Sequence, residues 1–530
     1  MIIESLAVFA VVIVLCVLLN NVSSRLGIPV LLAFLLLGML YGNVSTDMKL
    51  NYDTAGSICS VALIFIMFYG GFGTSWRTAR KVAVEASLLA TAGVFLTALV
   101  TGLFCRFVLG WGWIEALLMG SVVSSTDAAS VFSILRSRRL GLKNNIAPLL
   151  EVESGSNDPM SYMLTMVMLS LLGPGMSGGA VLWMLVKQIV IGAGLGLAIA
   201  KGTVYVMRRF KFATSGFDSL FILAVAIFSY AIPNSIGGNG YLSAYIVGIM
   251  LGNSEFPGKK SLVGFFDGLT NLMMVIIFFD LGLLARPSVL LESAIPAVAI
   301  FFCLLLLARP LSVFAVLMPF RKYTPRQNGF ISFVGLRGAA SIAFAIMAMG
   351  EEVFLEHDIV NIVFGIVLIS IAAQGSLIPM MARRFGVVDS GSDVMKTFND
   401  FAEEADVQFI EVEIDESNAW ADHQVLELNI QKGILMCMIY RGEEHFIPDG
   451  HTVIRAGDRV VLASKAFRSG NGLMIVEETI QPGSPWAGIE LKNYPIKNRQ
   501  VVLIKRGEKR IIPHGNTVIR EDDVLYINRG

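Results

Sequence analysis

A short acidic stretch, Glu151 to Pro159, interrupts an apolar run from Ile146 to Leu172. The run is long enough to cross a lipid bilayer, for which about 20 residues suffice. A charge at mid-bilayer costs at least ~2.5–3.5 kcal/mol, so such groups usually face a bundle interior or a water-filled cavity. A carboxylate there can hold either a small monovalent cation or a proton. We therefore expect this stretch to carry a cation one way and a proton the other.

Helical spacing divides the acidic stretch into two faces. Ser154 and Asp158 are four residues apart and share one face, and Glu153 and Asn157 share the neighbouring face. Carboxylate and hydroxyl oxygens suit a hard cation, so we expect Asp158 and Ser154 to bind the ion. Glu153 and Asn157 are expected to hold a partner helix. The predicted partner of Glu153 is Arg337, because a lone buried charge is far costlier than a paired one.

A second set of polar residues, Ser124 to Asp127, lies in another apolar run. It again places hydroxyl groups beside a carboxylate, and we expect Thr126 and Asp127 to complete the ion site. Hydroxyl groups of membrane helices often only hydrogen-bond neighbouring helices. For Ser124 and Ser125 that structural role is an equal alternative, whereas for Asp127 and Asp158 we expect a role in transport.

The composition is that of a membrane protein. Of 530 residues, 55% are hydrophobic and only 15% are charged, which argues against a soluble enzyme, and the zero net charge argues against nucleic acid as a partner. The apolar runs predict about thirteen spans, the first at residues 5–20. Lysine and arginine gather in alternate loops, so these loops are predicted to be cytoplasmic. The N-terminus is then outside and the C-terminal tail inside.

The membrane part contains a weak internal repeat. Three segments recur about 210 residues later: Gly38–Asn43 as Gly248–Asn253, Ile66–Gly70 as Ile277–Leu281, and Asp127–Ser130 as Gly338–Ser341. Each pair is seven predicted spans apart, so its two members have opposite orientations in the membrane. Inverted repeats are typical of secondary transporters, whose substrate site lies where broken helices meet near mid-membrane.

The pattern changes after the membrane part, which is predicted to cover residues 1–385. Residues 386–404 are polar and acidic and are interpreted as a linker. Residues 405–530 alternate apolar and polar side chains in short runs, which indicates half-buried β-strands. Tyr440–Arg455 matches Lys505–Arg520, so we expect two similar β-rich lobes at 405–470 and 471–530.

These motifs carry a family resemblance. Ser125–Phe132, Glu151–Pro159 and Val334–Ala339 resemble the NhaP-type monovalent cation:proton antiporters, closest to the potassium/proton or cell volume regulation branch of bacteria. The tail resembles two TrkA-C (RCK C-terminal) domains. The resemblance implies a polytopic α-helical membrane protein of about 13 spans in inverted repeats with broken crossing helices, and small cytoplasmic regulatory domains of α/β, β-rich type. It also implies a homodimer in the bacterial inner (plasma) membrane that works by alternating access.

The resemblance also implies roles for single residues. The ion site of the family maps to Asp158, Asp127, Ser154 and the backbone near Thr126. The pair Asn157–Asp158 resembles the electroneutral branch, in which one cation exchanges for one proton. Potassium and sodium both suit oxygen ligands, so the choice between K⁺ and Na⁺ stays open. The tail is expected to respond to a small ligand, such as a cyclic dinucleotide, at Arg441, Arg455 or Arg506, unless these arginines are only solvated turn residues.

The chain departs from the family pattern at two positions. Close relatives carry an acid in the third span where this chain has Tyr69, and this chain has Asp280 in the tenth span where an apolar residue is expected. One hypothesis is that Asp280 takes over the role of the missing acid or hydrogen-bonds Tyr69. The alternative is that Asp280 lies near the outer membrane surface, close to Arg286, and meets water.

Three other functions compete with exchange. A cation channel regulated by RCK-type tails lacks support because no Thr-Val-Gly-Tyr-Gly-like filter is present. A membrane-bound enzyme lacks support because no His-Glu-x-x-His, Gly-x-Ser-x-Gly or metal-spaced cysteine and histidine set occurs. A ligand sensor with a membrane anchor would leave the acids within the spans unexplained.

Overall fold

The computed structural model describes most of the chain in two compact units, Met1–Glu403 and Glu404–Gly530. The described residues are 10–11, 14, 30–44, 51–138, 140–172, 178–210, 216–256, 259–285, 287–350, 355–389, 407–415, 418, 420–428, 430, 434–442, 444–465, 475–481, 483–494, 500–506, 509–511 and 513–528. Most of the predicted first span at 5–20, and Arg286, lie outside them.

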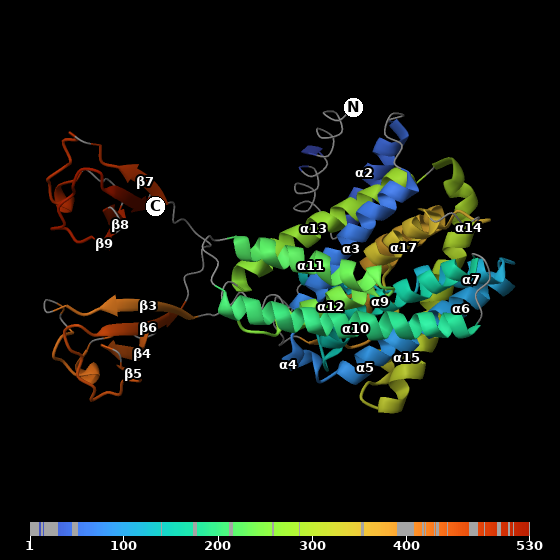
Figure 1. The fold of residues 1–530 in the computed structure, drawn as a ribbon, viewed down its shortest axis with the longest axis horizontal. Coiled ribbons are helices and arrows are strands. Elements are labelled where there is room, and N and C mark those ends of the chain that lie inside the picture. Colours follow the sequence, from blue (N-terminus) through green and yellow to red (C-terminus); the bar gives the residue numbers. More distant parts are fainter. Residues whose placement is uncertain are drawn as a thin grey trace. The chain divides into compact units, whose positions relative to one another are not determined.

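The first unit is built of helices (Figure 1). Their bounds are α2 Val30–Val44, α3 Tyr52–Gly73, α4 Trp76–Ala79, α5 Ala83–Leu88, α6 Val94–Phe107, α7 Trp113–Val122, α8 Ala128–Ser137, α9 Ile146–Leu172, α10 Gly178–Arg209, α11 Phe217–Ser235, α12 Gly240–Gly252, α13 Lys259–Leu284, α14 Pro287–Cys303, α15 Arg309–Leu317, α16 Pro325–Phe333, α17 Ala339–Gly350, α18 Ile359–Ile369 and α19 Ser376–Arg384. Single π-helical turns continue α5 into α6, α14 into α15, and α18 into α19.

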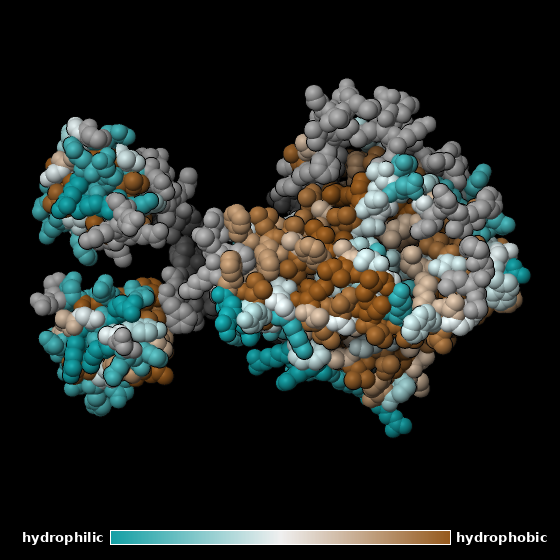
Figure 2. All heavy atoms as spheres, viewed as in Figure 1, coloured by the Kyte–Doolittle hydropathy of each residue, from teal (hydrophilic) through white to brown (hydrophobic). Residues whose placement is uncertain are grey.

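The helices of this unit are suited to a membrane. Within the described ranges, seven helical segments are long and apolar enough to cross a bilayer, and four shorter apolar helices accompany them. The total of about thirteen spans stays a prediction. Figure 2 shows a broad apolar surface, to which α10 contributes the exposed side chains of Leu182, Trp183 and Val190. Apolar side chains exposed over such an area suit contact with lipid rather than water.

Two helix pairs are interrupted at the same kind of place, as the repeat predicts. The chain is extended from Ser124 to Asp127, between α7 and α8, and again from Gly335 to Gly338, between α16 and α17. The two extended segments meet, because the backbone N–H of Asp127 donates a hydrogen bond to the carbonyl of Leu336 at 2.9 Å. The prediction of broken, crossing helices is therefore confirmed.

Helix packing confirms the inverted repeat. Four glycines leave no room for a Cβ against a carbonyl of the facing helix: Gly38 against Phe279, Gly248 against Phe68, Gly42 against Leu283, and Gly252 against Phe72. Helix α2 of the first repeat thus packs on α13 of the second, and α12 of the second packs on α3 of the first. The contact between α2 and α13 therefore recurs between α12 and α3, which are the equivalent helices of the opposite repeats. Two copies of one structural repeat produce this relation.

The start of the predicted linker belongs to the membrane unit. Strand β2, Val388–Asp389, pairs in antiparallel fashion with β1, Gly141–Leu142. The backbone N–H of Lys143 also donates to the carbonyl of Val387 at 2.9 Å. The linker predicted at 386–404 therefore begins with residues that are anchored beside α8 and α9, and residues 390–400 lie outside the described part.

The second unit contains two antiparallel four-stranded sheets, one in each predicted lobe. The first has the order β3-β6-β4-β5, and the second β7-β10-β8-β9. Their strands are β3 Val407–Glu413, β4 Ile434–Arg441, β5 Glu444–Phe446, β6 Arg459–Lys465, β7 Ile475–Thr479, β8 Gln500–Arg506, β9 Lys509–Ile511 and β10 Val524–Asn528. The two orders correspond strand by strand, as expected from the tandem sequence repeat.

One ion pair recurs in both lobes of the tail. In the first lobe, Arg441 donates from Nε and Nη2 to the two carboxylate oxygens of Asp458, at 2.8 and 2.7 Å. Arg506 and Asp523 repeat this bidentate pair at 2.8 and 2.7 Å. Both aspartates are buried. Arg441 and Arg506 are therefore neither free ligand-binding groups nor solvated turn residues, because each neutralises a buried carboxylate of its own lobe.

Candidate functional site

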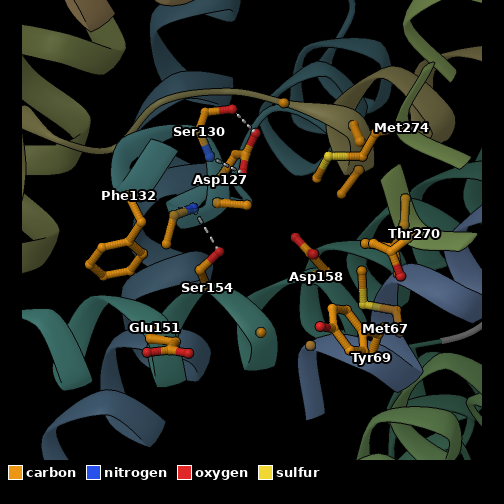
Figure 3. A pocket seen from close by; sticks show the side chains of 18 of the residues that line it. Met67, Tyr69, Asp127, Ser130, Phe132, Glu151, Ser154, Asp158, Thr270 and Met274 are labelled. Carbon is orange, nitrogen blue, oxygen red and sulfur yellow. Dashed lines mark hydrogen bonds between the residues drawn. The ribbon is translucent and has the colours of Figure 1, made fainter. Parts of the chain in front are cut away.

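A cavity of about 350 Å³ lies in the membrane unit beside the crossing of the extended segments. Its lining includes Asp127, Ser154 and Asp158, together with Glu151 and Tyr69 (Figure 3). Asp158 extends from α9 toward the centre of this cavity, opposite the first turn of α8. The structure thus brings together the predicted ion ligands from two separate stretches of the sequence.

Asp158 has the property that an ion ligand needs. Its Oδ1 atom is buried and has no hydrogen-bond partner within the described part of the chain. An unpaired carboxylate oxygen inside a protein is costly, so it favours a bound cation or proton. The neighbouring residue in α9 is Pro159, which lacks the N–H that would close the helical hydrogen bond to residue 155. The carbonyl of Gly155, which also lines the cavity, thus lacks its usual helical donor.

Ser154 joins α9 to the extended segment. Its hydroxyl donates to the carbonyl of Thr126 at 2.8 Å and accepts from the backbone N–H of Ala128 at 3.0 Å. The side-chain amide of Asn157 donates to the hydroxyl of Thr126 at 2.7 Å. These bonds fix the Thr126 carbonyl and the Ser154 hydroxyl in the wall of the cavity that the Asp158 carboxylate also lines. All three present oxygen, which suits a hard monovalent cation.

Asp127 has a clear structural task in addition to lining the cavity. Its carboxylate accepts hydrogen bonds from the backbone N–H of Ser130 at 3.1 Å and from the Ser130 hydroxyl at 2.5 Å. It therefore caps the N-terminus of α8, where a negative charge is favoured by the helix dipole. Its repeat mate is Gly338, at the start of α17, where an added Cβ would overlap the Asp127 carboxylate. One aspartate thus lies beside the N-termini of both half-helices.

Glu153 has a different partner from the one predicted. Its carboxylate accepts from Arg309 Nη1 at 2.8 Å and from Arg309 Nη2 at 3.4 Å, and both side chains are at most 2% exposed. The predicted pairing of Glu153 with Arg337 is therefore wrong. Arg309 begins α15, directly after a π-helical turn. A signal existed in the sequence, because Arg309 is a single cation in the long apolar run at 288–318.

Arg337 is buried at the crossing and serves the backbone. Its Nη1 donates to the carbonyl of Ser124 at 3.0 Å and also to the carbonyl of Ser125. These carbonyls follow the C-terminal end of α7, where the helix dipole favours a positive charge. Asp127 and Arg337 thus have complementary roles. The acid lies at the N-terminal ends of the half-helices, and the cation lies at a C-terminal end.

Tyr69 and Asp280 do not contact each other. The hydroxyl of Tyr69 donates to Asp267 Oδ1 at 3.2 Å. Asp267 is on the same helix as Asp280 but thirteen residues earlier, a rise of about 20 Å. The hypothesis of a Tyr69–Asp280 hydrogen bond is therefore wrong, and Asp267, which also lines the cavity, is the acid beside Tyr69. No feature of the sequence pattern had indicated Asp267.

Asp280 lies away from the cavity lining. It is only 6% exposed, and its Oδ2 is buried without a hydrogen-bond partner among the described residues. The expectation that Asp280 meets water is therefore wrong, whereas its closeness to Arg286 lies outside the described residues and its role in place of the missing acid stays a prediction. Its neighbour on α3 is Cys59, which is itself buried.

This architecture, with inverted repeats, two broken helices that cross and a polar cavity beside the crossing, defines the chain as a secondary transporter of the membrane. Comparisons with known proteins give the family. The model for the transmembrane domain of sodium/hydrogen exchangers matches residues 10–384, and the TrkA-C domain model matches residues 409–466 and 475–527. The chain therefore belongs to the sodium/hydrogen exchanger family, a family of transporters rather than enzymes, and carries two TrkA-C domains.

Similar proteins agree with this assignment. The chain is 34% identical to the K(+)/H(+) antiporter NhaP of Alkalimonas amylolytica over 467 residues, which cover 87% of this chain and 81% of the relative. It is 25% identical to the Na(+)/H(+) antiporter ApNhaP of Aphanothece halophytica, over 70% of this chain and 72% of the relative. The structure of the sodium proton antiporter MjNhaP1 from Methanocaldococcus jannaschii superposes with a TM-score of 0.64, covering 72% of this chain and 99% of that one, at 24% identity. This structural likeness shows the fold.

Proposed function

We propose that the protein exchanges a monovalent cation, K⁺ or Na⁺, for H⁺ across the membrane, and that Asp158 binds either ion in turn. The observation that carries the proposal is the buried, unpartnered Oδ1 of Asp158 at the wall of the cavity. Similarity to relatives named as K(+)/H(+) antiporters supports K⁺ as the first cation to test.

The exchange follows from competition for one carboxylate. A bare charge is costly inside the membrane, so Asp158 crosses an apolar barrier cheaply only when it is protonated or holds a cation. The Ser154 hydroxyl and the Thr126 carbonyl are placed to share a cation with it. Since one carboxylate cannot hold a proton and a cation together, each transport step carries one of them. One cation then exchanges for one proton, and the cycle moves no net charge.

The residue before Asp158 supports this stoichiometry. Asn157 is fully buried, and its amide bonds to the Thr126 hydroxyl. It is neutral at any pH, so it adds no second proton-binding group beside Asp158. Glu153, on the same face, is neutralised by Arg309 and is held away from the exchange. Of these two acids of α9, Glu153 is thus paired with a cation, whereas Asp158 keeps one buried oxygen without a hydrogen-bond partner among the described residues.

The remaining features of the proposal concern the whole assembly. The protein works by alternating access as a homodimer in the bacterial inner membrane, with its N-terminus outside and the tail in the cytoplasm. The distribution of lysine and arginine supports this orientation. The TrkA-C domains bind a small ligand of nucleotide type and thereby bias the conformations of the membrane unit. Such a ligand binds outside the Arg441–Asp458 and Arg506–Asp523 pairs, which are already satisfied.

A reconstituted transport assay tests the proposal. Proteoliposomes loaded with a pH-sensitive dye receive K⁺, Na⁺ or Li⁺, with the full chain or a chain without residues 405–530. We expect a saturable pH change with K⁺ or Na⁺ that Asp158→Asn abolishes. Asp280→Asn is the matched control, because it removes another buried acid of the same unit that does not line the cavity. Full exchange by the Asp158→Asn protein would refute the proposal.

The same liposomes separate exchange from channel conduction. An electroneutral exchanger moves the dye signal without any change of membrane potential, and clamping the potential with an ionophore leaves its rate unaltered. A cation channel would instead set up a potential and carry single-channel currents in planar bilayers. Inverted repeats around a cavity that buried carboxylates line support exchange over conduction.

A further inference from the structure

Two carboxylates and an imidazole converge at a second place in the membrane unit. Glu115 lies in the first turn of α7, and Glu356 and His357 lie shortly before α18. One ligand atom from each residue lies within 4.8 Å of the other two. Glu115 is buried, His357 is half-buried and Glu356 is exposed. The cluster is separate from the cavity, because none of its members lines it.

The imidazole of His357 has an unsatisfied atom that faces the cluster. Its Nδ1 is buried and has no hydrogen-bond partner among the described residues, although it lies at ion-pair distance, 3.2 Å, from Glu115 Oε2. A tetrahedral metal ion with bonds of about 2.0–2.1 Å keeps its ligand atoms about 3.3–3.5 Å apart. The Nδ1–Oε2 separation is therefore close to the edge of a metal coordination tetrahedron. A cation between the two atoms would satisfy both.

Neighbouring groups hold these ligands in place. The His357 ring stacks on Trp111 with ring centroids 4.1 Å apart and an angle of 17° between planes. The other oxygen of Glu115 accepts the backbone N–H of His357 at 2.9 Å. Supporting contacts of this kind fix the direction of metal ligands and raise affinity. Asp358, the next residue, is already used, because it accepts from the backbone and side chain of Asn361.

We propose that Glu115, Glu356 and His357 bind a divalent transition-metal ion of the Zn²⁺ class. Carboxylates are hard ligands, and an imidazole is a borderline ligand. Two carboxylates with one imidazole therefore suit Zn²⁺ and leave a fourth position for water. The ion joins the start of α7 to the segment that leads into α18. Glu115 is seven residues, or about 11 Å along the helix, before Val122, where α7 ends and the chain leads into Ser124. The site therefore clamps the broken helix that carries the ion-binding backbone.

Metal titration of the whole protein tests this site. The full-length chain, purified without a histidine tag and stripped with a chelator, is titrated with ZnCl₂ by calorimetry. We expect one Zn²⁺ per chain, and at least a ten-fold loss of affinity in His357→Ala and in Glu356→Gln. Glu356 is exposed, so its substitution keeps the fold even where His357→Ala does not. His514→Ala, an exposed histidine of the tail, is the control and should bind as the parent does.

X-ray absorption at the zinc edge gives an independent readout. The proposal predicts a first shell of nitrogen and oxygen only, with an imidazole contribution that is lost in His357→Ala. The site is refuted if the parent protein does not bind Zn²⁺ at submillimolar concentration. It is equally refuted if His357→Ala and Glu356→Gln bind with unchanged affinity and stoichiometry, which would show adventitious binding elsewhere.

Discussion

Breaking the buried ion pair of Glu153 and Arg309 should be costly. Both side chains are at most 2% exposed and are joined by two hydrogen bonds of 2.8 and 3.4 Å. Removing one partner leaves an uncompensated charge in a low-dielectric interior, which costs about 3–5 kcal/mol. Replacing both partners by apolar residues of similar size is often neutral or stabilising. Glu153→Leu and Arg309→Met should therefore each destabilise the protein strongly, and the double variant should recover most of the loss.

A double-mutant cycle measures this coupling. Thermal unfolding of the detergent-solubilised protein is followed for the parent, both single variants and the double variant. A loss of 3–5 kcal/mol corresponds to about 4–6 °C for a unit of this size, at the unfolding entropy per residue of globular domains. A second cycle pairs Glu153→Leu with Arg337→Met. Arg337 bonds to backbone carbonyls and not to Glu153, so this second pair should couple clearly more weakly than Glu153 and Arg309.

The two cycles distinguish the observed pairing from the one that the sequence suggested. Strong coupling of Glu153 to Arg337, with additive effects of Glu153 and Arg309, would refute the pairing seen in the structure. Weak coupling in both cycles would refute the view that Glu153 is neutralised by a specific cation. Either result would return Glu153 to the set of acids that can take part in exchange.

Two further predictions follow from single contacts. Gly338→Ala pushes a Cβ into the Asp127 carboxylate, so we expect at least a ten-fold loss of the exchange rate in proteoliposomes. Gly264 has open space around it, so Gly264→Ala should keep the parent rate. Equal exchange rates of the Gly338→Ala protein and the parent would contradict the close approach. In the tail, burial alone would raise the pKa of Asp458, but the hydrogen bond from Arg441 outweighs it and lowers that pKa below 3.8. A lowered carboxyl pKa stabilises the fold above about pH 4 and loses this effect as the pH falls through the folded-state value. Arg441→Met should therefore lower the stability of the first lobe by about 2 kcal/mol at pH 7 and weaken the dependence of that stability on acid pH. Amide hydrogen exchange in β4 and β6 of the full chain measures this stability. Unchanged amide exchange in the variant would contradict the prediction.

Much of the candidate site was predictable because it is encoded locally. The spacing of Ser154 and Asp158 places them on one helix face whatever the helix packs against, and the structure has them there. The internal repeat indicated that the stretch at Asp127 has a counterpart at Gly338. In the structure these two residues occupy equivalent places at the two helix breaks. The close helix contacts at Gly38 and Gly248 were not predicted, although both glycines belong to the repeated segments, and a residue without a Cβ permits backbones to touch.

The errors concern choices between distant partners. Two buried arginines, Arg309 and Arg337, were available to Glu153, and the pattern of one sequence does not say which helix lies closer. The repeat aligns Asp280 with Tyr69, which suggested that the two side chains are in contact. Residues at equivalent positions of two repeats need not be neighbours in space. In the structure the acid beside Tyr69 is Asp267, about 20 Å earlier on the same helix. Tertiary packing decided each case.

The central claim is that a single carboxylate, Asp158, holds either the cation or the proton. Its most direct test is to count the protons released when the purified protein binds K⁺ or Na⁺, by calorimetry in two buffers of different ionisation enthalpy. Near the pH at which Asp158 is half protonated, we predict cation binding with substantial proton release, approaching one proton per cation at lower pH, and loss of both in Asp158→Asn. Cation binding without proton release at any pH, or unchanged release by the Asp158→Asn protein, would contradict the account.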